Sequence, residues 1–108
     1  MIEVRIIRIS VNSEFSRLGF MKGISYLVYT KDLTYSTMLV IEGEKRVGYS
    51  EYLYTFYKVY YEHKQQHAKY LKVYIENESA LKVIKKVEGY LNYLDYLKRI
   101  NSREGHIT

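Results

Sequence analysis

The stretch that decides the fold is residues 79–101, SALKVIKKVEGYLNYLDYLKRIN, which has the repeat of a long amphipathic helix. At 100° per residue its apolar side chains fall on one broad stripe. The stripe consists of Ala80, Val83, Ile84, Val87, Tyr90, Leu91, Leu94 and Leu97. Asn77 or Ser79 can cap the start of this helix. A stripe this wide must be covered, so we expect the helix to pack on a β-layer formed by the rest of the chain.

Four segments ahead of and between the helices have the β-branched, short-period pattern of strands. We expect strands at residues 1–11, 24–30, 36–42 and 70–76. The intervening segment 12–23 opens with cap-type side chains and closes with a glycine. Helical spacing relates Phe15, Leu18 and Met21, which predicts a short helix that ends near Gly23.

A tight hairpin is expected directly after residues 36–42. In the sequence VIEGEKRV, Gly43 and Glu44 fit the centre of a type II′ turn, since glycine readily adopts a positive φ at the first central position. This register places Glu42 opposite Lys45 and predicts a further strand over residues 45–49.

Residues 50–68, SEYLYTFYKVYYEHKQQHA, fit two alternatives. A strand would place Leu53, Thr55, Tyr57, Val59 and Tyr61 on one face and Tyr52, Tyr54 and Phe56 on the other. A helix would begin at Ser50 and continue through strong helix formers in its second half. We favour the helix, because EHKQQHAK contains no glycine, proline or asparagine that could turn a hairpin.

Together these elements predict an α+β fold. It consists of an antiparallel or mixed sheet of four to five strands, with two to three helices packed on one face and the long amphipathic helix at the C-terminus. Without the strand at 45–49, the order of elements is compatible with a ferredoxin-like core. For a chain of 108 residues we expect a single domain over residues 1–101 and a flexible tail over 102–108.

The composition excludes several classes of site. The chain has no cysteine, so disulfides, thiolate zinc sites and cysteine nucleophiles are excluded. No apolar run approaches the ~20 residues needed to cross a bilayer, so we expect a cytoplasmic protein with no membrane partner. The distinctive features are a net charge of +5 and fourteen tyrosines without proline or tryptophan.

This mixture of lysine, isoleucine, valine and tyrosine, without cysteine, is similar in style to small proteins of hyperthermophilic archaea and of their viruses or plasmids. The similarity is one of composition and covers no motif. It implies a thermophilic, archaeal-virus source, and in that case a location in the host cytoplasm.

The sequence has no pattern typical of a catalytic or metal site. Its carboxylates are scattered, and neither a GxSxG motif, a phosphate-binding glycine loop nor a dinucleotide fingerprint occurs. His63 and His67 would share one face of a helix, a spacing compatible with two metal ligands, but no third ligand accompanies them. We therefore expect no enzymatic activity, metal, cofactor or small-molecule substrate.

The first functional candidate is a basic and aromatic surface. Lysine and tyrosine interleave along the strand expected at 70–76, where tyrosine rings could stack on bases while lysines contact phosphates. In the alternative, the tyrosines pack beneath a helix and the lysines only keep the protein soluble. The candidate nucleic-acid-binding residues are Lys69, Tyr70, Lys72, Tyr74, Lys82, Lys85 and Lys86, with DNA or RNA as the partner.

The second functional candidate is association between copies of the chain. Tyrosine is enriched at protein interfaces, and the 49–61 segment has more tyrosines than one side of a helix in a small monomer can bury. The candidate interface residues are Tyr52, Tyr57, Tyr60, Tyr61, Tyr93 and Tyr96. The sequence thus predicts a non-catalytic binding protein that forms a homodimer. Its function is nucleic-acid binding or, alternatively, that of a protein-interaction or homo-oligomerisation module of an archaeal virus or plasmid.

Overall fold

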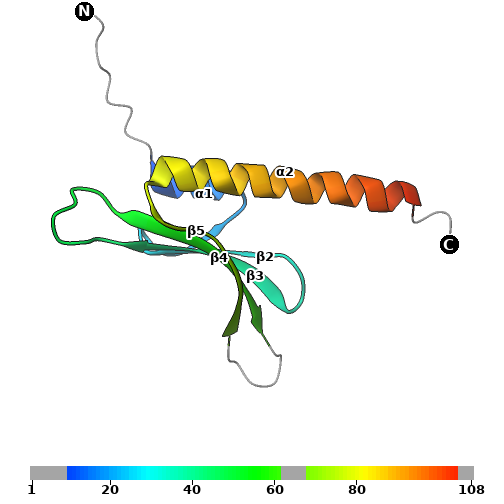
Figure 1. The fold of residues 1–108 in the computed structure, drawn as a ribbon, viewed down its shortest axis with the longest axis horizontal. Helices are drawn as coiled ribbons and strands as arrows, with labels where there is room; N and C mark the ends of the chain where they lie inside the picture. Colours follow the sequence, from blue (N-terminus) through cyan, green and yellow to red (C-terminus); the bar gives the residue numbers. More distant parts are fainter. Residues whose placement is uncertain (1–9, 62–67, 105–108) are drawn as a thin grey trace, which may run out of the picture.

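A five-stranded antiparallel sheet with two helices on one face makes up the fold (Figure 1). The computed structural model describes residues 10–61 and 68–104, with the backbone alone for Ala68, Tyr70, Leu71, Arg103 and Glu104. In chain order the elements are α1 (Val11–Arg17), β1 (Met21–Ile24), β2 (Val28–Asp32), β3 (Thr37–Glu44), β4 (Leu53–Tyr61), β5 (Ala68–Glu78) and α2 (Ala80–Glu104). The predicted α+β class, with its long C-terminal helix, is confirmed.

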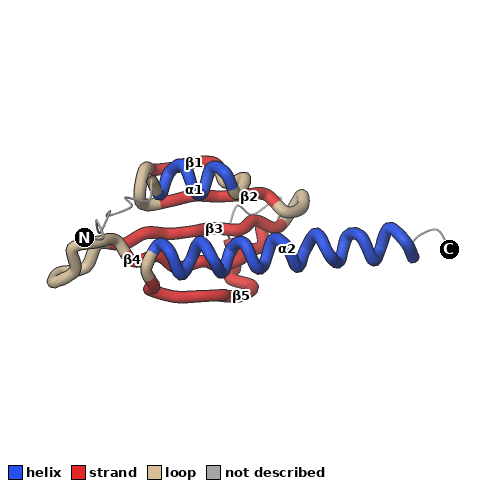
Figure 2. The backbone as a smooth tube through the Cα atoms, turned by 90° about the horizontal axis from the view of Figure 1, so that it is seen from above, coloured by secondary structure: helices blue, strands red, loops and turns tan. Residues whose placement is uncertain are grey.

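Each strand of the sheet pairs with the next strand along the chain, in the order β1-β2-β3-β4-β5. A ferredoxin-like core is therefore wrong, because in that fold another strand lies between two strands that a helix connects, whereas here every strand pairs with its neighbour in sequence. Viewed from above, α1 lies over the β1–β2 side of the sheet and α2 over the β4–β5 side (Figure 2). In the described parts of the chain, no helix covers the other face.

Helix α2 lays its predicted apolar stripe on the sheet. Val83, Ile84 and Val87 are buried in the main core, and Tyr90 and Leu91 pack at its margin. The Lys82 backbone N–H donates to Ser79 Oγ over 3.4 Å, which caps the helix start as expected. The second half of α2 extends past the sheet (Figures 1 and 2), and the helix ends at Glu104, later than predicted. The division into a domain and a tail stays a prediction.

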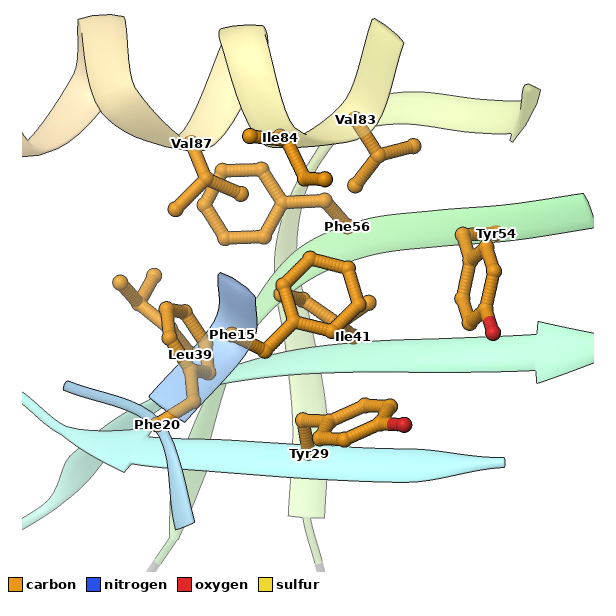
Figure 3. Close-up of a cluster of buried hydrophobic side chains, with 10 residues drawn as sticks. All are labelled: Phe15, Phe20, Tyr29, Leu39, Ile41, Tyr54, Phe56, Val83, Ile84 and Val87. Atoms are coloured by element: carbon orange, nitrogen blue, oxygen red, sulfur yellow. The ribbon is translucent and has the colours of Figure 1, made fainter. Parts of the chain in front are cut away.

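The main core between the helices and the sheet is unusually aromatic (Figure 3). Phe15 of α1 is completely buried, and its ring centroid lies 4.7 Å from that of Tyr29 and 5.7 Å from that of Tyr54. Ring pairs in tilted or edge-on geometry stabilise by roughly 0.5–1.5 kcal/mol beyond their buried area. A smaller cluster of Val40, Tyr57 and Val59 lies on the face without helices. The sheet is thus apolar on both faces.

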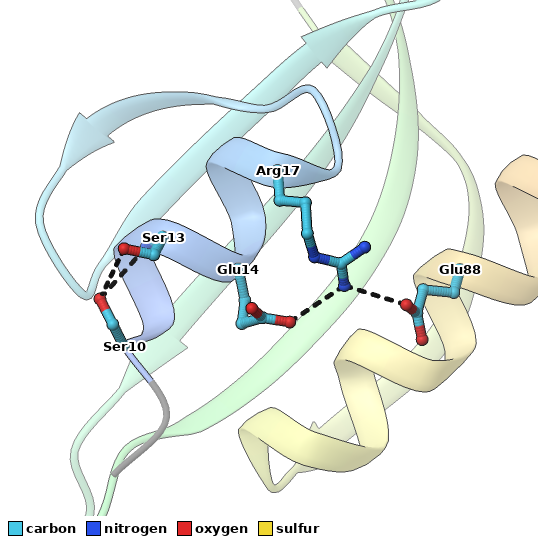
Figure 4. Close-up of polar contacts among 5 residues, drawn as sticks. All are labelled: Ser10, Ser13, Glu14, Arg17 and Glu88. Carbon is cyan, nitrogen blue, oxygen red and sulfur yellow. Dashed lines mark hydrogen bonds and ion pairs between the residues drawn. The ribbon is translucent and has the colours of Figure 1, made fainter.

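Helix α1 is short and is held at both ends (Figure 4). The Ser13 backbone N–H donates to Ser10 Oγ over 3.3 Å, which caps the N-terminus. Near the other end, the Arg17 guanidinium bonds Glu14 at 3.0 Å and Glu88 of α2 at 2.9 Å. These hydrogen bonds, first to Glu14 and then to Glu88, raise the pKa of Arg17. The charged bridge joins the two helices above the sheet.

The N-terminal predictions need two corrections. The helix predicted to reach Gly23 ends at Arg17, because Gly19 takes a φ of +93° and turns the chain into β1, where Met21 is exposed. The strand predicted at 1–11 lies outside the described residues over 1–9, and Val11 begins α1 instead.

The turn predicted at Gly43 and Glu44 is wrong, because β3 continues through both residues into its pairing with β4. Glu42 lies opposite Thr55 rather than Lys45, and residues 45–49 form no strand. Gly43 serves a close approach instead: a Cβ there would collide with the Tyr26 carbonyl oxygen and lie 2.6 Å from Tyr54 Cε1. After β3 the chain turns later than predicted, over residues 45–52, and a further turn at residues 25–27 joins β1 to β2.

The helix favoured for residues 50–68 is also wrong, since Leu53–Tyr61 form strand β4. β4 is central in the sheet and apolar on both faces: Tyr54 and Phe56 face the helices, while Tyr57 and Val59 face the other side. Burial on two faces removes the alternation that identifies a strand in sequence. His63 and His67 lie outside the described residues.

Candidate nucleic-acid interface

Three lysines gather on the β4–β5 pair, beyond the part that α2 covers. Lys58 lies directly opposite Lys72, and Tyr60 lies directly opposite Lys69. Because side chains alternate along β4, Lys58 and Tyr60 share the face of Tyr54 and Phe56, which is the face that carries the helices. Lys69 and Lys72 are exposed, and Lys58 is half-buried. The register thus places three cations on one side of two neighbouring strands.

This lysine group has no compensating carboxylate in the described parts of the chain. The ion pairs found there join Arg17 to Glu14 and Glu88, Arg46 to Glu44, and Lys82 to Glu78. Like charges directly opposite each other on antiparallel strands are destabilising. Lys72 gains some compensation from Tyr74, whose ring centroid lies 5.6 Å from Lys72 Nζ. The Lys58–Lys72 pair is therefore an unbalanced concentration of positive charge.

Tyr74 does not lie on an exposed face, contrary to the sequence prediction. Its ring lies under α2, with centroid distances of 4.5 Å to Tyr90 and 4.9 Å to Phe56. Tyr74 still lies beside Lys72, as the alternation predicts, but α2 packs on this part of the strand and covers the ring. Burial, and secondly the interaction with Tyr90, raise the pKa of Tyr74. The alternative in which this tyrosine packs beneath a helix is confirmed, so Tyr74 supports Lys72 but offers no free ring.

The lysines of α2 divide between two sides of the helix. Lys82 and Lys86 are one turn apart and lie on the flank above β5, as shown by the 3.4 Å contact of Lys82 with Glu78. Tyr90, one turn further along this flank, meets Tyr74 of β5. Lys85 is exposed on the side opposite Val87, away from the sheet.

The structure therefore brings together four of the seven predicted nucleic-acid-binding residues and adds one. The surface, called the lysine face below, consists of Lys58, Lys69, Lys72, Lys82 and Lys86. The side chain of Tyr70 is not described, although its backbone pairs with Val59. Sequence reasoning missed Lys58 because it placed that residue in a helix. The strand alternative for residues 50–68 contained the signal.

The tyrosines proposed as interface residues have different environments. Tyr57 is buried within the chain, and its hydroxyl donates to Glu42 Oε1. Tyr52 stacks on Tyr26, while Tyr60 and Tyr61 are half-buried. Tyr93 and Tyr96 of α2 remain 55% and 54% exposed. Of the six proposed interface tyrosines, only Tyr93 and Tyr96 are more than half exposed.

The described residues contain neither a cluster of metal ligands nor a membrane-spanning helix. Residues 10–61 and 68–104 contain no group of three histidine, cysteine, aspartate or glutamate side chains that could hold a metal ion. Within the same ranges, neither helix is long and apolar enough to span a bilayer.

Comparison with known proteins finds one informative relative. The chain is 41% identical over 95 residues to the uncharacterized protein YddA of Bacillus subtilis (strain 168). The aligned region covers 88% of this chain and 92% of the relative. No family model matches the chain. No solved structure matches it. The relative is bacterial, so the archaeal-virus source predicted from composition is not supported.

Proposed function

The chain belongs to the family of Bacillus subtilis YddA, and we propose that it binds nucleic acid through the lysine face. The observation that carries this proposal is the direct opposition of Lys58 and Lys72 on neighbouring strands, with no acidic partner in the described residues. A fold that only needed soluble lysines would place them apart. An anionic polymer relieves this repulsion, because phosphates can lie between the two ammonium groups.

The arrangement of the remaining lysines suits a polyphosphate chain. Lys69 continues the group along β5, and Lys82 and Lys86 continue it along the adjoining flank of α2. Such a row of cations neutralises successive phosphates and releases the counterions condensed on them. We expect this release, rather than reading of base edges, to supply most of the affinity.

The test is fluorescence anisotropy with a labelled single-stranded oligonucleotide, measured across a range of salt concentrations. The single variants Lys58→Gln and Lys72→Gln are each expected to bind more weakly, with a salt slope reduced by about 1 for the phosphate contact removed. The matched control is Lys22→Gln, because Lys22 is exposed on β1, at the opposite edge of the sheet from β5. The control should bind like the parent protein.

Two results would reject this function. The first is that the parent protein retains neither DNA nor RNA at low salt. The second is that Lys22→Gln weakens binding as much as the change at Lys58 or Lys72, which would indicate attraction by net charge alone.

A second candidate function, association of two copies, draws on the projecting half of α2. Tyr93 and Tyr96 are more than half exposed there, and Leu97 continues the apolar stripe one turn beyond Leu94, which still lines a pocket with Leu33. A second α2 laid antiparallel about Leu97 brings Asp95 of each helix level with Arg99 of the other, so the segment is self-complementary in charge.

Light scattering tests this second candidate. We expect a dimer for the parent protein and a shift towards monomer for Tyr93→Ser, Tyr96→Ser, with the circular dichroism spectrum unchanged. A monodisperse monomer at high protein concentration would count against association through α2.

A further inference from the structure

A stacked pair of tyrosines lies at the opposite end of β4 from Lys58. The ring centroids of Tyr26 and Tyr52 are 5.8 Å apart with an interplanar angle of 22°, and Tyr26 is 47% exposed. Tyr52 connects the pair to the core, because its ring lies 6.5 Å from that of buried Tyr54. The result is an outer ring supported from beneath by a second ring and a packed core.

Tyr26 has a backbone conformation that few residues other than glycine adopt. Its φ is +68°, in the left-handed region. Its N–H donates to the Tyr29 hydroxyl over 2.8 Å, and the Gly43 N–H donates to the neighbouring Leu27 carbonyl over 2.8 Å. Gly43 also leaves room for the Tyr26 carbonyl where a Cβ would collide with it. Strained backbone of this kind persists only where surrounding contacts fix it, and it is frequent at functional sites.

A cation completes the arrangement. Lys45 Nζ lies 5.9 Å from the centroid of the Tyr52 ring, and no ion pair in the described residues engages Lys45. The neighbouring cation differs, since Arg46 is paired with Glu44 at 3.7 Å. A free ammonium beside an exposed, supported ring is the combination that single-strand binding proteins use for a phosphate and its base.

The stacked pair continues into the lysine face rather than lying apart from it. Tyr54, two residues after Tyr52, pairs with Glu78, and Glu78 contacts Lys82 at the start of α2. Lys86 lies one turn further along α2, between Lys82 and the Tyr90–Tyr74 contact beside Lys72. Lys58 comes six positions after Tyr52, about 20 Å at the rise of a strand. This distance lies within the footprint of one strand of nucleic acid on a small domain, roughly 4–16 nucleotides.

We propose that the Tyr26–Tyr52 pair is a stacking platform for a base of single-stranded nucleic acid, with Lys45 contacting the adjoining phosphate. This inference rests on the proposed function and specifies its ligand. A duplex keeps its bases stacked on each other, so it offers no face to Tyr26, whereas a single strand does. The protein therefore prefers single strands over duplexes of the same charge.

The experiment uses two substitutions of Tyr26 in the full chain. Tyr26→Asn removes the ring and tolerates the left-handed backbone. We expect it to weaken single-strand binding about 5- to 150-fold while the salt slope stays unchanged, because no phosphate contact is lost. Tyr26→Trp introduces the only tryptophan of the chain, and its emission should be quenched by a single strand but not by a duplex.

Tyr49→Asn is the matched control, since Tyr49 is 54% exposed between β3 and β4 and has no ring partner in the described residues. It should bind a single strand like the parent protein. Melting curves of each variant report whether the fold is retained, and Tyr26→Trp keeps an aromatic ring if Tyr26→Asn unfolds.

The failure of this inference can be distinguished from failure of the proposed function. If neither single strand nor duplex is retained, the proposed function and the platform both fall. If binding still depends on Lys58 and Lys72 but is equal for single strand and duplex, with Tyr26→Asn unchanged and Tyr26→Trp unquenched, only the platform is overturned.

Discussion

At the scale of single residues, the hydroxyl of Tyr54 is the group in least favourable surroundings. Its oxygen is buried and has no hydrogen-bond partner in the described structure. A buried polar group left unsatisfied costs about 1–3 kcal/mol. We expect Tyr54→Phe to stabilise the protein by roughly 1–2 kcal/mol, because it removes that penalty and keeps the ring contacts. Urea unfolding monitored by circular dichroism measures the change, and a loss of stability would indicate a hidden partner for the hydroxyl.

The same residue gives the stability of the protein a dependence on alkaline pH. Burial raises the pKa of Tyr54 above its usual value, and burial also raises the pKa of Tyr74. In the unfolded chain these tyrosines ionise near pH 10, while in the folded protein they stay protonated. Their contribution is therefore complete below about pH 10 and is lost as the pH rises above that value. The Tyr54→Phe variant should lose stability less steeply over this range.

Gly43 and Gly89 form a matched pair for testing steric space. A Cβ on Gly43 would collide with the Tyr26 carbonyl and with the Tyr54 ring, whereas a Cβ on Gly89, in α2, would meet nothing within 4 Å. We expect Gly43→Ala to destabilise the fold by at least ~1–3 kcal/mol, as overpacking does. Gly89→Ala should stabilise it by about 0.5–1 kcal/mol through helix propensity. Thermal unfolding of both variants tests this, and equal effects would contradict the tight packing at Gly43.

At the scale of elements, α2 was predictable and β4 was not, for a physical reason. The stripe of α2 is a local pattern, because every residue on it is placed by the same 3.6-residue repeat and covered by one surface. β4 is covered on two faces by side chains from distant parts of the chain, so Tyr54 and Tyr57 are both buried and the alternation disappears. Gly43 misled in a similar way: a glycine needed for a close contact has the same appearance in sequence as a glycine needed for a turn.

Substitutions on the buried stripe and on the exposed side of α2 should have different effects on stability. Ile84 is 4% exposed in the main core, and Leu81 is 48% exposed on the same helix. Ile84→Ala should destabilise by about 2–5 kcal/mol, the range for large-to-small changes in a core. Leu81→Ala should change stability by less than about 0.5 kcal/mol. Unfolding curves of the two variants decide the matter, and a loss at Leu81 equal to that at Ile84 would mean that α2 buries a different face.

At the scale of the whole molecule, the sequence predicts only some of the residues that form the candidate site. Lys69 and Lys72 were predictable because they lie in a strand with a clear pattern, and Lys82 and Lys86 because they lie on a clear helix. Lys58 and Tyr26 were not, since their roles depend on a strand pairing and on a strained turn. Both features arise from contacts across the sheet and leave no local repeat.

Repulsion within the lysine face should make the stability of the free protein depend on salt. This dependence distinguishes a surface built for binding from lysines that only keep the protein soluble. Replacing Lys72 by Glu puts an opposite charge across from Lys58, in place of a like charge. Cross-strand pairs of opposite charge stabilise by roughly 0.2–1 kcal/mol, while like pairs destabilise. Added salt screens repulsion over ~10 Å at 0.1 M, so it should stabilise the parent protein and stabilise Lys72→Glu less or not at all. Loss of the Lys72 contact with Tyr74 does not change this salt dependence, because it is a short-range interaction.

The control for this prediction is Lys22→Glu, which changes the net charge equally but faces Tyr29 across the strand pair. It should keep the salt dependence of the parent protein, measured as the midpoint of thermal unfolding against salt concentration. Nucleic-acid affinity should fall more for Lys72→Glu than for Lys22→Glu. Lys72→Glu should therefore be more stable than the parent protein at low salt and at the same time bind nucleic acid more weakly. If both variants change stability and affinity alike, the net charge of the protein determines both effects, and the opposition of Lys58 and Lys72 has no special role.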